Sequence, residues 1–299
     1  MGNELGRVRR LAGPLVLGIA MSHVSGLVDN MLASMLPEGQ LSYLSYGKKV
    51  LDAIVLIGPW ALVTVVYSRA ADLHGAGRDG EMATLIRRAV RLLLYVSVPL
   101  TCMLAVLRVP LVACLFERGE FDIFSTQGTA DALLLYACGL VTFSLEGLLV
   151  YCFYSLSDTR TPVATGIACA ALDILLAIVL LPSCQYLAIV AALVVSKTIK
   201  IVILGCLLSR RGLRILGAGM PGFLAKVLLA GAACWLAIGV GQLAPWPAAV
   251  LRFLVPAGLG ALAYLAASHA LRMEECRAVV SMVTDKFRRA GNRGRHNRQ

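Results

Sequence analysis

The chain has 299 residues, of which 59% are hydrophobic and only 15% are charged, with a mean hydropathy of +0.78. A soluble globular domain cannot bury so large an apolar fraction, so the composition excludes that class and favours a membrane protein. The formal charge of +11 does not indicate a nucleic-acid partner, because Lys and Arg gather in short segments between apolar runs and in the stretch 272–298.

Apolar runs divide most of the chain into candidate membrane spans, since about 20 apolar residues of helix cross a bilayer. The first run continues to about residue 36 without a cleavage pattern, which favours a retained span over a signal peptide. The run at 89–115 is the least regular, because Pro99 and Pro110 interrupt it. We expect an all-α integral membrane protein of about eight transmembrane helices, covering about 11–36, 41–69, 89–115, 126–156, 162–181, 186–209, 222–243 and 247–271.

Positive charge alternates between the connections, which predicts the orientation of the spans. The connections 37–40, 182–185 and 244–250 contain no Lys or Arg. Basic residues instead precede the first span and follow the second and the sixth, and they mark the cytoplasmic side of a membrane. We therefore expect both termini in the cytoplasm, on the side of Arg7, Arg9, Arg10, Arg78, Arg87, Arg88, Arg91, Arg210, Arg211 and Arg214.

Ionisable residues interrupt the second span. Lys48 and Asp52 are four residues apart on one helix face, so they can pair locally, whereas Lys49 points about 100° away. Lys49 is then the residue available to a substrate anion. The alternative is that both lysines lie near the end of the span and extend to the lipid headgroups.

Further charges lie in the later spans. Lys197 and Lys200 are three residues apart on one face and repel each other unless a phosphate, Asp173 or Glu146 lies opposite. Asp173 lies in the middle of its span and is a candidate ion or counter-charge site, as is Asp29 in the first span. A structural ion pair between Asp173 and one of the lysines is the alternative.

Motifs for catalysis or tight metal binding are not found in the sequence. The nine cysteines form no CxxC pair and lie mostly in apolar runs, which is typical of small hydrophobic residues. No P-loop, GxSxG or HExxH pattern occurs. The sequence gives no support for enzyme chemistry.

Four segments together carry a family resemblance, and their order and spacing match as well. They are SHVSGLVDNMLAS at 22–34, YGKKV at 46–50, LFERGEF at 115–121 and FYSLSDTRTP at 153–162. With these segments the chain resembles the MurJ/MviN family of lipid II flippases in the multidrug/oligosaccharidyl-lipid/polysaccharide (MOP) exporter superfamily. The resemblance covers nearly the whole chain up to the basic tail.

The resemblance implies a fold, a substrate and a partner. The family is expected to have two six-helix lobes and two extra helices, to work by alternating access, and to bind the pyrophosphate of lipid II, a peptidoglycan precursor, in a cationic cavity. This chain resembles the second lobe at 1–215 with the two extra helices at 216–272, followed by a basic tail at 273–299. It is then expected in the bacterial inner membrane, acting with a separate first-lobe polypeptide or with itself.

The resemblance also assigns residues. Lys49 stands where the family motif, similar to Tyr-Ala-Asp-Arg, has its Arg, and Lys48 replaces the Asp. A pyrophosphate would thus meet Lys49 and Lys48, together with Lys197 and Lys200. The family's sodium site implies roles for Asp29 and Asp173, so a monovalent cation is the one coupling partner expected, and no organic cofactor is. Asp52 and Glu146 are the remaining candidate counter-charges.

Two other functions remain open at the level of sequence. One is a non-transporting membrane subunit that keeps the lobe as a scaffold for interactions. The other is the export of a different polysaccharide-lipid or of a drug by a relative within the same superfamily.

Overall fold

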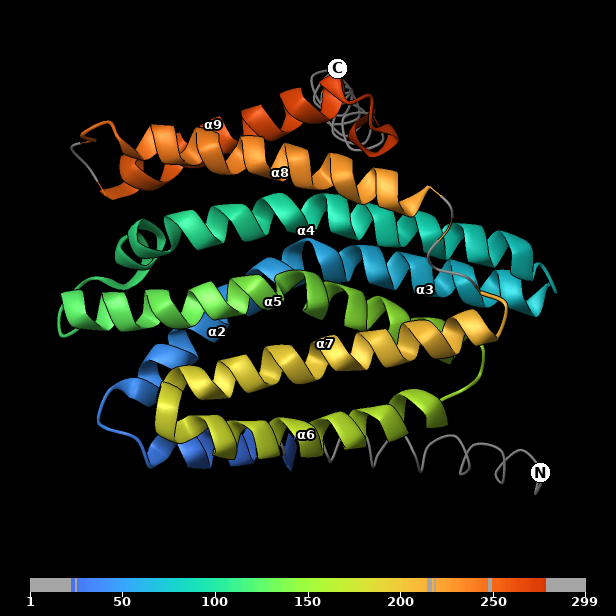
Figure 1. Cartoon of the computed structure of the whole chain (residues 1–299), viewed down its shortest axis with the longest axis horizontal. Helices are drawn as coiled ribbons and strands as arrows, with labels where there is room; N and C mark the ends of the chain where they lie inside the picture. Colours follow the sequence, from blue (N-terminus) through green and yellow to red (C-terminus); the bar gives the residue numbers. More distant parts are fainter. Residues whose placement is uncertain (1–22, 25, 214–216, 218, 247–248, 278–299) are drawn as a thin grey trace, which may run out of the picture.

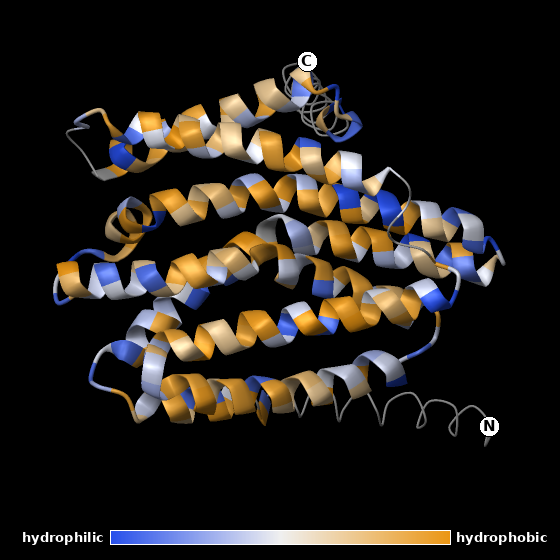
Figure 2. Cartoon of the chain, viewed as in Figure 1, coloured by the Kyte–Doolittle hydropathy of each residue, from blue (hydrophilic) through white to orange (hydrophobic). Residues whose placement is uncertain are grey.

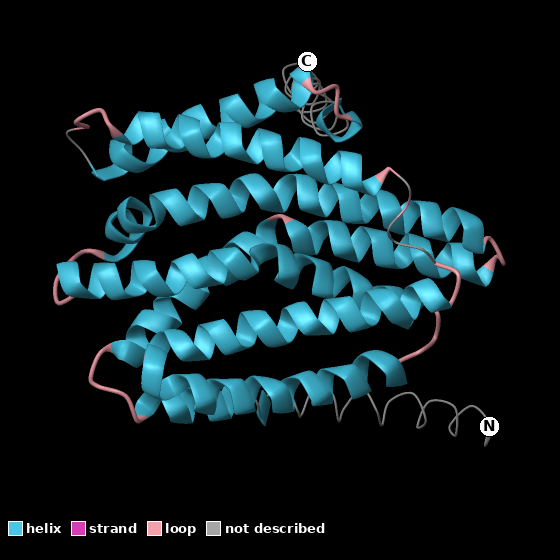
Figure 3. Cartoon of the chain, viewed as in Figure 1, coloured by secondary structure: helices cyan, strands magenta, loops and turns pink. Residues whose placement is uncertain are grey.

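The computed structural model describes residues 23–24, 26–213, 217, 219–246 and 249–277. In this part of the chain the secondary structure is helical, without strands (Figure 3). Residues 26–34 form a helix, and eight labelled helices follow it (Figure 1). They are α2 (Gln40–Ile57), α3 (Pro59–Gly75), α4 (Asp79–Phe116), α5 (Ile123–Ser155), α6 (Arg160–Cys184), α7 (Tyr186–Arg210), α8 (Met220–Gln242) and α9 (Ala249–Ala270).

The predicted all-α membrane architecture is confirmed. Six described helices, α4 to α9, are long and apolar enough to cross a membrane, and α2 with α3 makes a seventh span if the pair is counted as one. Most of the predicted span at 11–36 lies outside the described residues. Figure 2 shows hydrophobic colour along the lengths of the helices and hydrophilic colour mainly near their ends and connections.

The predicted span at 41–69 is two helices instead of one. α2 and α3 meet at 43°. Pro59 opens α3 and has no backbone N–H to continue the hydrogen bonding of α2, and Gly58 ends α2 with its own N–H bonded to Ile54. The sequence interpretation missed this break because the apolar run continues across it.

The predicted irregularity at 89–115 is wrong, because α4 is one helix of 38 residues that contains both Pro99 and Pro110. Neighbouring helices in a bundle can accommodate a proline within a span. The helix also starts earlier than predicted, at Asp79, with acidic residues in its first turn that favour the helix N-terminus. Arg87, Arg88 and Arg91 therefore lie on α4 and not in a loop.

α5 is the central helix of the first part of the bundle. It packs against α2, α3, α4 and α7, and α6 packs on α7 (Figure 1). One buried apolar cluster, which includes Leu133, Ala137 and Leu140 of α5, joins it to α2 and α4. A second cluster, which includes Leu148 and Phe153, continues from α5 into α3, α4, α7, α8 and α9. Both halves of α5 thus have fixed surroundings, which holds the polar side chains between them in place.

α8 and α9 form a pair that packs on α4. The two helices approach closely at Gly260, where a Cβ atom would lie 2.4 Å from Cγ1 of Ile238. Tyr264 of α9 is buried and donates a hydrogen bond of 2.8 Å to the backbone oxygen of Tyr95 in α4. The division into a lobe at 1–215 and two added helices at 216–272 stays a prediction.

Candidate functional site

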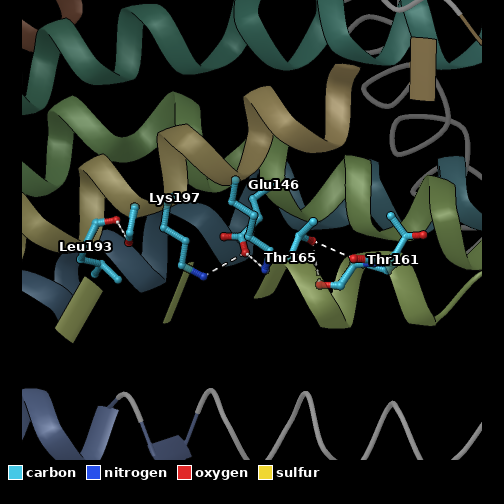
Figure 4. A network of polar contacts seen from close by, with 8 residues as sticks. Glu146, Thr161, Thr165, Leu193 and Lys197 are labelled. Carbon is cyan, nitrogen blue, oxygen red and sulfur yellow. Dashed lines mark hydrogen bonds and ion pairs between the residues drawn. The ribbon is translucent and has the colours of Figure 1, made fainter. Parts of the chain in front are cut away.

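A three-residue charged cluster joins α5 and α7 halfway along the bundle. Nζ of Lys197 lies 2.9 Å from Oε1 of Glu146, and Nζ of Lys200 lies 2.6 Å from the same oxygen. Figure 4 shows the side chains of Lys197 and Glu146 pointing toward each other. The sequence allowed a phosphate, Asp173 or Glu146 as the counter-charge of these lysines, and in the structure it is Glu146. Two ammonium groups share one carboxylate oxygen, so the cluster itself carries one net positive charge.

The position of this cluster makes its charge costly. Lys197 lies near the middle of α7, about 20 Å from Arg210 at the end of that helix, too far for its side chain to reach the membrane surface. A lysine at the centre of a span costs about 3 kcal/mol on insertion scales. Its side chain is 31% exposed, against 12% for Lys200 and 14% for Glu146. Lys197 is therefore the member of the cluster most accessible to a bound molecule.

Small and polar residues surround the cluster. A Cβ atom on Gly166 of α6 would lie 3.4 Å from Nζ of Lys200, so the absence of a side chain there leaves room for the ammonium group. Thr142 of α5 and Thr198 of α7 form a hydrogen bond of 3.3 Å between the same two helices. The interface of α5 and α7 is thus polar near its centre, in contrast to the apolar clusters above and below it.

α2 carries a second group of charges. The predicted pair of Lys48 and Asp52 is confirmed, with 2.9 Å between Nζ and Oδ2, and both side chains are more than half exposed. Lys49 points elsewhere and its Nζ lies 5.1 Å from the ring centre of Tyr46, within range of a cation–π interaction. The structure does not place Lys48 or Lys49 in the Glu146 cluster, so the predicted lysines form two groups.

The predicted carboxylates Asp29 and Asp173 belong to a third region. Asp173 is buried on α6 with 2% exposure, and Asp29 is half-buried on the helix at 26–34. Both lie within electrostatic range of Tyr136 on α5, together with Asp52. Among the described residues no three His, Cys, Asp or Glu side chains converge on one point. A sodium site therefore stays a prediction.

The segment between α5 and α6 has a structural role. Asp158 accepts hydrogen bonds from the backbone N–H and the hydroxyl of Thr161, in the first turn of α6. It also forms an ion pair with Arg211 at the end of α7, a contact between residues 53 apart that no sequence pattern indicated. Burial raises the pKa of Asp158, but the hydrogen bonds from Thr161 and Arg211 outweigh it and hold that pKa below its usual value.

Long apolar helices with a charged cluster halfway along them define a polytopic membrane protein. The sequence model of the family described as lipid II flippase MurJ matches residues 1–253. The chain belongs to this family, whose members are transporters and not enzymes, and it is accordingly a multi-pass inner-membrane protein.

Individual relatives agree with this assignment. The chain is 28% identical over 273 residues to the probable lipid II flippase MurJ of Vibrio cholerae, covering 87% of this chain and 51% of that protein. It is 25% identical over 230 residues to the lipid II flippase MurJ of Burkholderia cenocepacia, covering 75% and 45%. The chain thus spans about half the length of these curated relatives.

Solved structures share the fold. A lipid II flippase MurJ in an inward closed conformation superposes with a TM-score of 0.75 at 20% identity, covering 90% of this chain and 55% of that one. A MOP superfamily transporter from Pyrococcus furiosus gives a TM-score of 0.60 at 14% identity, covering 91% and 66%. At these identities the likeness concerns the fold alone.

Proposed function

We propose that the chain is one lobe of a flippase that moves lipid II, or a closely related lipid-linked pyrophosphate, across the inner membrane. The observation that carries this proposal is the Glu146 cluster, where two lysines share one carboxylate oxygen in the middle of the bundle. A positive charge that is expensive in hydrocarbon is well suited to a function that brings an anion to it. Relatives named lipid II flippase support the choice of anion.

Within the cluster the two lysines have different roles in this proposal. Lys197 is the more exposed and has the longer contact to Glu146, so it is the residue that a pyrophosphate would bind. Lys200 is more buried and has the shorter contact, so it holds Glu146 when Lys197 turns to the substrate. Lys49 and Lys48 of α2 offer further positive charge to the same headgroup or to its approach.

A second bundle is part of the proposed transporter. Alternating access requires one bundle to move against another around a shared site. The charged side chains of Lys48 and Asp52 are more than half exposed in this chain, and such groups in an apolar layer need water or another protein beside them. We assign this face of α2 to a cavity shared with a further six-helix lobe, provided by another polypeptide or by a second copy.

Coupling to a monovalent cation is a further element of the proposal. Asp29 and Asp173 are the carboxylates that would receive a monovalent cation. One turn after Asp173, however, α6 has Ala177, and residues 187–191 near the start of α7 offer no side-chain oxygen. A dependence of transport on the sodium gradient that disappears in Asp173→Asn would support the assignment, and transport that is indifferent to sodium would refute it.

Complementation of a cell depleted of its own flippase tests the proposed function. The chain is expressed alone and together with the first six-helix half of a relative such as that of Vibrio cholerae. Rescue is expected when the first six-helix half is co-expressed, and it should be lost in Lys197→Met. The absence of rescue in both arms, with the protein present in the membrane, would refute the proposal. Rescue that survives both Lys197→Met and Lys49→Ala would favour a scaffold that does not transport.

A further inference from the structure

A basic hollow lies at the end of α9, away from the Glu146 cluster. It has a volume of about 270 Å³ and is lined by His269, Ala270, Arg272, Met273, Cys276 and Arg277. The candidate span ends at Ala270, so the hollow begins where the chain leaves the apolar layer. That level of a membrane is occupied by lipid headgroups.

The floor of the hollow is held by contacts to two other helices. Oε1 of Glu275 lies 2.7 Å from Nε of Arg91 on α4, and this glutamate is buried. The guanidinium of Arg91 in turn lies 4.7 Å from the ring centre of Phe223 on α8. Met273 and Cys276 are buried in the same apolar cluster as Phe223. The segment after α9 is therefore fixed against the bundle, and the hollow is a built feature of the fold.

The charge around the hollow is predominantly positive. Arg272 and Arg277 are exposed, as is His269. The carboxylate of Glu275 is engaged by Arg91, which leaves the exposed Glu274 as the acidic residue of this segment. Lys226 donates a hydrogen bond of 3.0 Å to the backbone oxygen of Leu271 and so offsets the negative end of α9. The sequence that follows, 278–299, has one acidic residue and is itself strongly basic, so its charge does not compensate the hollow.

We propose that the hollow formed by residues 269–277 binds the phosphate of an anionic phospholipid headgroup. Two guanidinium groups at headgroup level match a phosphodiester, because guanidinium offers paired N–H donors to phosphate oxygens. The site is separate from the proposed transport site and does not depend on it. It anchors the end of α9 to the membrane surface and gives the protein a preference for anionic lipid.

Titration of the detergent-solubilised protein with dioctanoyl phosphatidylglycerol tests this site, with dioctanoyl phosphatidylcholine as the neutral probe. The variant Arg272→Gln/Arg277→Gln is expected to bind phosphatidylglycerol about 30-fold more weakly, from about 1 kcal/mol for each basic residue near a charged membrane surface. The variant Arg272→Lys/Arg277→Lys keeps the charge and should stay within about threefold of the parent. Both arginines are exposed, so the variants should unfold at the temperature of the parent.

The control is Arg69→Gln/Arg210→Gln, which removes the same formal charge from exposed positions near the ends of α3 and α7. It is expected to bind phosphatidylglycerol like the parent. Equal weakening in both Gln variants would refute a discrete site, because general surface charge would then explain the binding. Equal affinity for phosphatidylcholine would refute it too. Displacement of the lipid by millimolar inorganic phosphate would overturn the assignment to a headgroup in favour of a free anion.

Discussion

Replacement of Glu146 by Gln removes the one carboxylate that Lys197 and Lys200 share while keeping its shape. Loss of one partner of a buried ion pair typically costs about 3–5 kcal/mol, because it leaves an uncompensated charge. Here one carboxylate serves two lysines at 2.9 and 2.6 Å, so the cost should lie in the upper part of that range. We expect Glu146→Gln to lower the free energy of unfolding by about 4–5 kcal/mol.

The lysine variants should destabilise the protein much less than Glu146→Gln does. Lys197→Met or Lys200→Met leaves Glu146 with one lysine, and the cluster becomes neutral. The change in the free energy of unfolding should then be small, about 1 kcal/mol or less, since a neutral pair is cheaper in hydrocarbon than a charged triad. Lys200→Met should cost more than Lys197→Met, because Lys200 is the more buried of the two. Transport, in contrast, should be lost in Lys197→Met.

Unfolding in a titration with denaturing detergent measures these differences, and Glu120→Gln is the control for loss of a carboxylate. Glu120 is exposed in the connection between α4 and α5, so its replacement should change stability by about 0.5 kcal/mol at most. If a lysine variant were as unstable as Glu146→Gln, the cluster would be a purely structural triad. The proposal that its excess charge serves a substrate would then fail.

Three further perturbations have defined outcomes. Asp158→Asn should lower stability at pH 7 by about 1–2 kcal/mol. Because the pKa of Asp158 is depressed, its contribution is present above the unfolded pKa of about 4 and is lost as the pH falls through the lower folded value, so variant and parent should converge in acid thermal scans. Gly128→Ala places a Cβ atom 2.5 Å from the ring of Tyr43 and should lower the free energy of unfolding by about 1–3 kcal/mol. Its control is Gly258→Ala, where a Cβ atom has nothing within 4 Å and should stabilise the helix by up to about 1 kcal/mol. Equal shifts of the two variants in thermal unfolding would contradict the packing described for α2 and α5. Lys49→Ala should leave the protein level in the membrane unchanged on immunoblots and reduce complementation, and full complementation would remove Lys49 from the substrate path.

The fold was largely predictable because hydrocarbon imposes a minimum length on each apolar helix. The runs at 126–156 and 186–209 correspond closely to α5 and α7. The predicted helix boundaries were wrong where a proline was interpreted without the helices that pack around it. Pro59 breaks a run that looks continuous, and Pro99 fails to break one that looks interrupted, because packing in the bundle decides whether a proline bends its helix.

Two kinds of residue in the candidate site were predictable from sequence. One kind pairs with a near neighbour in the chain, and the other places a charge within an apolar span. The pair of Lys48 and Asp52 follows from a spacing of four residues. Lys197 and Lys200 were identified because charges in a span require an explanation, but the choice of Glu146 over Asp173 depends on how α5 packs on α7. The pair of Arg91 and Glu275 joins residues far apart in the chain, and no periodicity indicates it.

The ion pairs of the structure are of two kinds: one-to-one pairs that stabilise the bundle, and a three-residue cluster that has a surplus positive charge. The pairs of Asp158 with Arg211 and of Glu275 with Arg91 each join one acid to one base, and a bound anion would gain nothing by breaking them. The Glu146 cluster alone among these has two bases for one acid. A phosphate can pair with Lys197 while Glu146 stays paired with Lys200, so every charge in the apolar layer retains a counter-charge. In the proposed function, exchange of partners at this cluster is the step that would couple substrate binding to movement of α7 against α5.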